Sequence, residues 1–334
     1  MSRSISRRRL STSLANAPRA ARRGLTNITF VRAPIEEIAT LGVGSFDYIV
    51  SAGVLHHLPS PEAGLAALAA VLNEGAAMGL MVYGRYGRLD IYQLQDLFRQ
   101  IAPPSLPTEQ RLEIVKSVLR RLGPDHWGNL AGSLWKTEIK AAGDAGLFDL
   151  FLHSTDRAYT VPEVHDLLAS AGMRLARFDV PILYDPRLNW PTLDLSGKSE
   201  PELQAIAEAL HGRMKKHTFF AIPLDAELPL APSPSDLDAI PVWLLHDPAL
   251  LMRQVEVRPQ LDLLYEGMDF HCTLDLFRRE FLRQVDGSRS TGQILECIAP
   301  RLPKYDDATL RSAWFKLHEA LSMFNVLGLT SAAG

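Results

Sequence analysis

Residues 46–58 have the sequence FDYIVSAGVLHHL, and this stretch decides how the rest of the chain is interpreted. The apolar run at 46–50 is typical of a strand that is buried on both faces, as strands of parallel sheets are. The small residues at 51–53 predict a turn. Because His56 and His57 come directly after it, the stretch predicts a buried strand whose carboxyl end leads into a turn bearing two histidines.

The residues around this strand alternate between strand and helix patterns. Leucines follow helical spacing within Pro61–Leu72, and Gly75 is expected to end that helix. Residues 28–31 predict a short strand before it, and residues 78–83 predict another strand after it. This order of elements predicts an α/β fold with right-handed crossovers between parallel strands.

A helical insertion interrupts the alternating pattern at about residues 88–150. Its first helix is amphipathic, three prolines break it, and a second helix follows near 109–122. The sequence TVPE at 160–163 is a capping box with proline in the first turn, and it predicts a helix that Gly172 closes. Strands are predicted at 174–180 and 217–222.

The last third of the chain predicts a separate, mainly helical domain. Five prolines within residues 223–241 favour an irregular linker, and apolar residues recur at helical spacing from Leu310 to Phe324. We therefore expect a first domain at 1–225, a linker at 226–242 and an accessory domain at 243–334. Residues within 281–295 are similar to small winged-helix domains, although we favour a plain helical accessory domain.

Composition narrows the class of protein. The chain has 334 residues, of which 47% are hydrophobic and 22% charged, as is typical of globular proteins. Its two cysteines cannot form a disulfide framework, and no apolar run reaches the ~18 residues of a membrane helix. We expect a soluble, cytoplasmic protein that does not bind a membrane.

The start of the chain is rich in arginine. Residues 1–35 contain eight arginines and no acid, so the remaining chain is strongly acidic, which argues against a general nucleic-acid binder. The composition of residues 1–24 is that of a transit peptide. The alternative, which we favour, is a solvated helix that ends at Gly24.

Residues 24–31, 46–58 and 71–83 form an ordered set that resembles class I S-adenosylmethionine-dependent methyltransferases. In that family a strand of this kind ends in a cofactor loop, a Leu-His-His-Leu helix start follows, and a turn leads into the next strand. The resemblance covers about residues 20–225 and is strongest at 25–86. It implies a Rossmann-like, doubly wound sheet and S-adenosylmethionine as the cofactor.

The resemblance also implies which residues contact that cofactor. The family's loop after the strand assigns cofactor contacts to Ser51, Ala52 and Gly53. Pro34 stands where the family usually has an aspartate that binds the adenine amino group. The groups left to serve there are Ala33, Ile35 and Glu36.

The family's glycine-rich cofactor motif does not occur in this sequence. In the family, a Gly-x-Gly-x-Gly loop holds the methionine part of the cofactor and an acid holds the ribose, but residues 1–27 contain neither. Without the strand before that loop, residues 46–50 would form an exposed hydrophobic edge that invites self-association or a partner. We expect the missing half upstream of residue 1, and the alternative is a truncated, inactive product.

Candidate catalytic residues lie near the ends of the predicted strands. His56 is the candidate general base, because an unperturbed histidine titrates near neutrality, and the alternative for the His56–His57 pair is packing or helix capping. Tyr83 is the candidate acceptor-lining residue, because open α/β sheets bind ligands at this edge. Its alternative is packing under the insertion. The candidate substrate-binding residues are Tyr86, His153, Arg157 and Tyr159, with an Asp156–Arg157 pair that fixes the helix entry as the structural alternative.

No metal site is predicted, because the cysteines lack Cys-x-x-Cys spacing and the histidines lack a His-x-x-x-His pattern. The phosphate-loop and hydrolase-elbow motifs are also absent from the sequence. The predicted function is S-adenosylmethionine-dependent methyl transfer to a small-molecule or protein acceptor. The alternative is a degenerate, non-catalytic methyltransferase fold that acts as a binding or scaffolding module.

Overall fold

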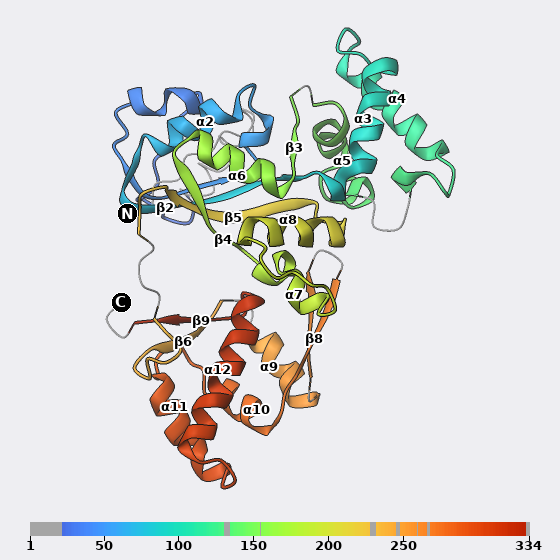
Figure 1. The fold of residues 1–334 in the computed structure, drawn as a ribbon. Coiled ribbons are helices and arrows are strands. Elements are labelled where there is room, and N and C mark those ends of the chain that lie inside the picture. Colours follow the sequence, from blue (N-terminus) through green and yellow to red (C-terminus); the bar gives the residue numbers. More distant parts are fainter. Residues whose placement is uncertain are drawn as a thin grey trace. The chain divides into compact units, whose positions relative to one another are not determined.

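The computed structural model describes residues 22–129, 134–153, 155–227, 232–244, 248–258, 260–265 and 268–331. The chain forms two compact units (Figure 1). Unit 1 consists of residues 1–175 and 200–224, and unit 2 consists of residues 176–199 and 225–334. Within the described ranges, every helix is too short or too polar to span a membrane.

Unit 1 is built on a mixed sheet, which confirms the predicted α/β class. Its strands run in the order β1-β2-β5-β4, and β3 pairs with β2 away from this path. β1 and β2 are parallel, whereas β5 is antiparallel to β2. The strands are β1 (Phe46–Ala52), β2 (Leu72–Gly84), β3 (Ala158–Tyr159), β4 (Met173–Phe178) and β5 (Lys216–Pro223).

Two helices lie side by side over the sheet, α2 (Pro61–Ala69) and α6 (Val161–Ser170) (Figure 1). The Ser60 side chain caps α2 by accepting a hydrogen bond from the Ala63 amide. The predicted capping box of α6 is present, with Glu163 at its third position. Both helices therefore begin where their sequences place a capping residue. A further helix of unit 1, α8 (Glu200–His211), packs against α6.

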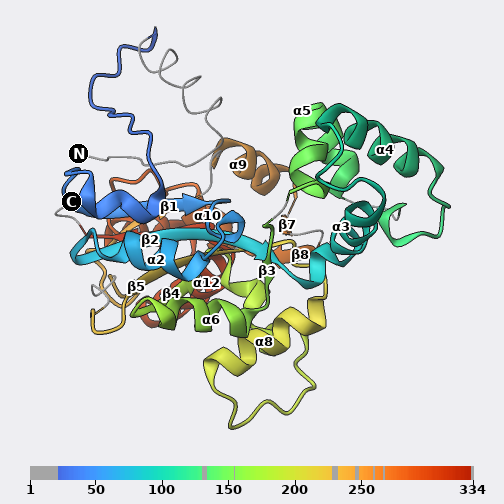
Figure 2. The ribbon, with the colours of Figure 1, turned by 90° about the horizontal axis from the view of Figure 1, so that it is seen from above.

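The predicted helical insertion is confirmed. It consists of α3 (Leu89–Ile101), α4 (Thr108–Arg121) and α5 (Leu134–Phe151), which follow the carboxyl end of β2 (Figure 2). These helices have a core of their own, in which the rings of Phe98 and Phe151 meet edge to face at 5.4 Å. The three helices of the insertion therefore pack on one another beside the end of β2.

The predicted strand at residues 28–31 is wrong, because these residues form no strand and Phe30 is 48% exposed. Strand-forming side chains need a neighbouring strand for their backbone hydrogen bonds, and this segment has none among the described residues. The expected helix at residues 1–24 lies almost entirely outside the described residues, which begin at residue 22. Ile35–Thr40 then forms the 3-10 helix η1, which packs against α2.

The strand after α2 begins earlier than the sequence predicts. α2 ends at Ala69, and β2 already starts at Leu72, where it pairs with Phe46. The register then shifts, and Gly75 takes a left-handed backbone conformation with φ +71° inside the irregular part. Gly75 was expected to end the helix, but it instead lets the chain bend within an extended strand.

β1 forms an edge of the sheet, since β2 is its partner within the described part of the chain. On β1, Tyr48 is 46% exposed and Val50 is 56% exposed. These apolar side chains lie on an unpaired strand edge, which is the feature expected to invite self-association or a partner. That partner remains a prediction.

Unit 2 combines helices with two pairs of antiparallel strands. Its core is apolar and is centred on Phe277, Phe281 and Trp314. The helices predicted at its carboxyl end are present, but the paired strands were not predicted. The elements are η5 (Pro181–Tyr184), α7 (Pro186–Asn189), β6 (Ile240–Trp243), α9 (Pro248–Val257), β7 (Gln260–Tyr265), β8 (Met268–Thr273), α10 (Leu276–Leu282), α11 (Thr291–Ile298), α12 (Asp307–Met323) and β9 (Leu327–Thr330), with β6 paired to β9 and β7 to β8.

Candidate active site

A sharp turn after β1 starts the candidate site. Gly53 has a φ of +73°, and its amide donates a hydrogen bond to the carbonyl of Met81 in β2. A residue with a Cβ is strained in this left-handed conformation, so glycine suits the turn. The chain then enters the 3-10 helix η2 (Leu55–His57), which places both histidines beyond the carboxyl end of β1.

The two predicted catalytic residues lie against each other. The ring centroids of His56 and Tyr83 are 3.8 Å apart, and Tyr83 stands near the end of β2. The guanidinium of Arg88 lies over the Tyr83 ring at 3.5 Å from its centroid. The structure therefore brings one residue from the end of each parallel strand into a single aromatic and basic cluster, with Arg88 beside it.

The insertion and the loop after it supply the remaining members of this cluster. The ring of His153 lies 4.2 Å from that of His57, and Asp156 Oδ1 lies 3.9 Å from His57 Nδ1. Gln95 of α3 donates a hydrogen bond of 2.9 Å to Asp156 Oδ2. The backbone is tied as well, because the Arg157 amide donates to the carbonyl of His56.

Burial governs the protonation of these histidines. Burial, with the neighbouring His57, lowers the pKa of His56 to about 2. Burial and the neighbouring His153 also lower the pKa of His57. His56 therefore stays neutral at physiological pH and keeps one nitrogen lone pair available, but it is a much weaker base than an exposed histidine.

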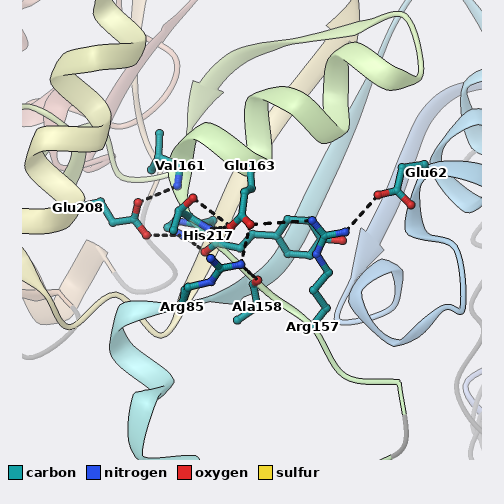
Figure 3. A network of polar contacts seen from close by, with 10 residues as sticks. Glu62, Arg85, Arg157, Ala158, Val161, Glu163, Glu208 and His217 are labelled. Atoms are coloured by element: carbon teal, nitrogen blue, oxygen red, sulfur yellow. Dashed lines mark hydrogen bonds and ion pairs between the residues drawn. The ribbon is translucent and has the colours of Figure 1, made fainter. Parts of the chain in front are cut away.

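A second group of polar residues joins β2, α2 and α6 (Figure 3). Arg85 donates a 2.6 Å hydrogen bond to Glu163, and Arg157 pairs with Glu62 at 3.3 Å. Burial alone would raise the pKa of Glu163, but hydrogen bonds from Thr160 and the nearby Arg85 hold that pKa below its usual value. These contacts stabilise the entry to α6 without an Asp156–Arg157 pair.

A buried pair completes the view in Figure 3. Glu208 of α8 accepts a 2.7 Å hydrogen bond from the Val161 amide, and its other oxygen lies 3.3 Å from His217 Nε2. His217 also contacts the carbonyl of Tyr159 at 3.1 Å. Both side chains are almost fully buried, so the pair links α8 and β5 to the first turn of α6.

The other predicted site residues occupy varied positions. Tyr159 is fully buried, with the Arg157 guanidinium 4.7 Å from its ring centroid, and burial raises the pKa of Tyr159 to about 12. Tyr86 is exposed at the start of η3 (Tyr86–Arg88). The roles of these residues in substrate binding stay predictions.

The predicted cofactor residues lie on two segments. Ser51 is buried at the end of β1, followed by the exposed Ala52 and the half-buried Gly53. Ala33 is half-buried, and η1 carries the buried Ile35 and the exposed Glu36. η1 packs against α2, the helix that connects β1 to β2. Their cofactor contacts also stay predictions.

Sequence analysis missed three polar residues near His57 and Tyr83, namely Arg88, Tyr92 and Gln95. They are spaced four and three residues apart, which places them on one face of α3. Arg88 and Gln95 are buried, so this polar face points inward. A polar stripe at helical spacing immediately after Tyr83 was the available signal. The capping alternative for His57 is not what the structure shows, because Ser60 caps α2.

Comparisons with known proteins match a part of the chain that includes β1 and both histidines of η2. Residues 7–79 match the family described as "Methyltransferase domain". The uncharacterized protein syc1184_c of Synechococcus sp. is 42% identical over 79 residues, which are 23% of this chain and 19% of that protein. The match thus spans about a fifth of the length of this curated relative.

Solved structures extend the likeness to almost the whole chain. The structure of PKMT2 from Rickettsia typhi is 13% identical, has a TM-score of 0.64, and is matched over 98% of this chain and 66% of its own. The structure of PKMT2 in complex with AdoHcy gives 11% identity and a TM-score of 0.65, over 99% of this chain and 67% of its own. At these identities the likeness shows the fold, and this chain spans about two thirds of those chains.

Proposed function

We propose that this chain, which is similar in fold to PKMT2 and matches the methyltransferase-domain family at residues 7–79, transfers a methyl group from S-adenosylmethionine to a small-molecule or protein acceptor. The observation that carries the proposal is the turn at Gly53, which leads from β1 to His56 and sets it against Tyr83. The carboxyl ends of parallel strands are where open α/β sheets bind their ligands.

The residues at the end of β1 fit a cofactor. Ser51 is buried, and its hydroxyl has no hydrogen-bond partner in the part of the chain that the structure describes. A Cβ built at Gly53 would meet the end of the Met81 side chain at 3.5 Å, an ordinary van der Waals contact, so it is the left-handed backbone that favours glycine at this turn. Ser51, Ala52 and Gly53 would hold the cofactor on this side, and Ala33, Ile35 and Glu36 would contribute at its adenine.

The protein's task in such a reaction is alignment. S-adenosylmethionine supplies an electrophilic methyl group on its sulfonium, so the chain must orient an acceptor nucleophile in line with it. In this proposal Tyr83 and Tyr86 line the acceptor, and the neutral His56 accepts a hydrogen bond from it. His153, Arg157 and Tyr159 are the proposed substrate-binding residues on the side of α6.

Binding of S-adenosylhomocysteine to the purified 334-residue chain tests the proposal directly. We expect calorimetric titration to give a micromolar dissociation constant, which corresponds to about −8 kcal/mol. Gly53→Ala should weaken this binding at least tenfold, because alanine opposes the left-handed turn. Gly172→Ala is the matched control, because Gly172 has a φ of +67°, an open environment, and a place at the far end of α6.

The two variants separate loss of the site from loss of stability. Both should destabilise the fold by similar amounts, about 1 kcal/mol, yet only Gly53→Ala should affect the ligand. Transfer of a labelled methyl group from S-adenosylmethionine to a candidate acceptor is the corresponding activity assay. Absence of S-adenosylhomocysteine binding to a folded chain would overturn the proposal and favour a non-catalytic binding or scaffolding module.

A further inference from the structure

Three potential metal ligands meet where η2 approaches the loop after α5. One ligand atom from each of His56, His57 and Asp156 lies within 4.8 Å of the other two. The histidines follow β1 directly, while Asp156 precedes β3. Two imidazoles and one carboxylate are a ligand set that proteins use for zinc and for ferrous iron.

Four ring-nitrogen and carboxylate atoms of this cluster have no hydrogen-bond partner among the described residues. His56 is 0% exposed, and neither of its ring nitrogens has a hydrogen-bond partner among the described residues. The same holds for His57 Nδ1 and Asp156 Oδ1. A buried polar atom that loses its hydrogen bonds to water costs about 1–3 kcal/mol, so such atoms in a native protein call for a ligand, an ion or ordered water.

We propose that His56, His57 and Asp156 bind one divalent transition-metal ion of the zinc and ferrous-iron class. In the four-coordinate geometry of zinc sites, metal–ligand bonds of ~2.1 Å place two ligand atoms ~3.4 Å apart. The observed limit of 4.8 Å therefore requires the ligand atoms to approach one another by up to about 1.4 Å. The His57 side chain is 16% exposed, and rotation of its ring can supply this movement, whereas the Asp156 side chain is fully buried.

The surroundings orient the carboxylate toward such an ion. Gln95 donates to Asp156 Oδ2, which leaves Oδ1 facing His57. Hydrogen bonds to the outer atoms of metal ligands fix their orientation in this way. The backbone carbonyls of His56 and His57 accept hydrogen bonds from the Arg157 amide and the Thr155 hydroxyl. The η2 segment is therefore held in place from the loop that carries Asp156.

Charge in the cluster is mixed. The buried Arg88 disfavours a second positive charge nearby and lowers the pKa of His57. The carboxylates of Asp156 and Asp149 favour positive charge there and raise that pKa. Arg88 is stacked on Tyr83, where the face of the aromatic ring stabilises it. The carboxylate of Asp156 is thus the ligand on which the affinity for a dication depends most.

This inference gives His56 a role that suits its weak basicity, and it takes the place of the hydrogen bond from the acceptor, because a neutral imidazole has a single lone pair. A neutral imidazole offers a lone pair to a metal without first losing a proton. Three protein ligands also leave a coordination position open, as in catalytic zinc sites. The inference does not rest on the proposed function, since metal binding and cofactor binding are measured with different ligands.

Zinc binding to the full chain, prepared without a histidine tag and treated with chelator, tests the inference. Calorimetric titration with ZnCl2 should give one ion per chain. Asp156→Asn should weaken the affinity at least tenfold while keeping the shape of the side chain, and His57→Gln should do the same. Co2+ bound in place of zinc should show visible absorption that both variants lose.

The matched control is a histidine–aspartate pair outside this cluster. In unit 2, His271 Nδ1 lies 2.8 Å from Asp262 Oδ1 on the surface. Asp262→Asn should leave the zinc affinity unchanged. Circular dichroism of each variant establishes that it is folded. The inference is overturned if the folded wild type binds no stoichiometric zinc, or if Asp156→Asn and His57→Gln bind zinc as tightly as the wild type.

Discussion

The two units of this chain differ in how completely their buried polar side chains are hydrogen-bonded. In unit 1, buried side-chain atoms without a hydrogen-bond partner among the described residues gather near the carboxyl ends of β1 and β2. Most of them belong to Ser51, His56, His57, Arg88, Tyr92, Asp156 and Tyr159, and a further one is Oε1 of Glu208 in α8. In unit 2, Arg279 is the described residue with such an atom.

The core of unit 2 shows the contrast most clearly. The Trp314 ring stacks on Phe281 at 4.6 Å, and its indole nitrogen donates a 2.8 Å hydrogen bond to the carbonyl of Pro234. Trp243 and Tyr265 also donate to backbone carbonyls, those of Val285 and Phe324. The core of unit 2 is therefore packed and hydrogen-bonded in a way that favours stability. In unit 1, by contrast, buried polar atoms without hydrogen bonds lie where a ligand could bind them.

The largest expected effect is on the core of unit 2. Trp314→Ala removes a fully buried indole, its ring contacts and its hydrogen bond. Replacement of a buried aromatic side chain by alanine costs about 3–5 kcal/mol, so we expect the free energy of unfolding to fall by about 4 kcal/mol. Urea denaturation followed by circular dichroism measures this change.

A neighbour on the same helix is the control for that substitution. Phe315 is 43% exposed, so Phe315→Ala should cost less than about 1 kcal/mol. Zinc binding at His56, His57 and Asp156 should stay unchanged in Trp314→Ala below its melting temperature, because unit 1 has its own core. Equal costs for both substitutions would contradict the described core of unit 2.

A smaller effect is expected at the buried pair of Glu208 and His217 in unit 1. Glu208→Ala leaves His217 and the Val161 amide without their carboxylate partner. Breaking a buried pair in this way costs about 3 kcal/mol. Glu208→Gln should cost less, because its amide oxygen can still accept the hydrogen bond from Val161. Thermal denaturation of the two variants compares them, and identical melting temperatures would show that the pair does not stabilise α6.

A substitution in the cluster of His56, His57 and Asp156 should instead raise the free energy of unfolding. In the metal-free chain, His56→Leu replaces a buried ring without hydrogen bonds by an apolar group of similar size. We expect a gain of about 1 kcal/mol in the free energy of unfolding, because an unsatisfied buried polar group is removed. The same variant should lose zinc binding. A marked loss of stability without metal would indicate that protein groups already satisfy His56.

Sequence patterns predicted the helices whose start and spacing depend on residues close together in the chain. The capping box at Thr160 and Glu163 fixed the start of α6, and helical spacing predicted α12. The strand at 28–31 failed because its β-branched residues cannot supply a neighbouring strand. The paired strands of unit 2 were missed for a related reason, since pairing joins segments such as β6 and β9 that lie far apart in the chain.

The candidate site also contains residues that the sequence predicted and others that it did not. The sequence placed His56 and Tyr83 separately near the ends of two predicted strands, and the structure brings their rings together. The absence of a His-x-x-x-His pattern argued against a metal, yet Asp156 reaches His57 through the fold. Only the tertiary structure brings such a carboxylate back to the end of β1, so a search for spaced motifs cannot find it.

The smallest expected effect concerns a half-buried histidine of unit 2, His318. Burial lowers the pKa of His318 below the usual 6.5. Below pH 6.5 the unfolded chain therefore binds more protons at His318 than the folded chain does. As a result, the free energy of unfolding falls as the pH drops below 6.5, whereas His318 does not reduce it above that pH. His318→Gln cannot titrate and should flatten the decline in melting temperature between about pH 7 and pH 5. A chelator keeps the cluster of unit 1 free of metal during these measurements. If His318→Gln and the wild type decline in parallel, His318 is as accessible to protons in the folded chain as in the unfolded one, and the contrast between the two units would no longer include it.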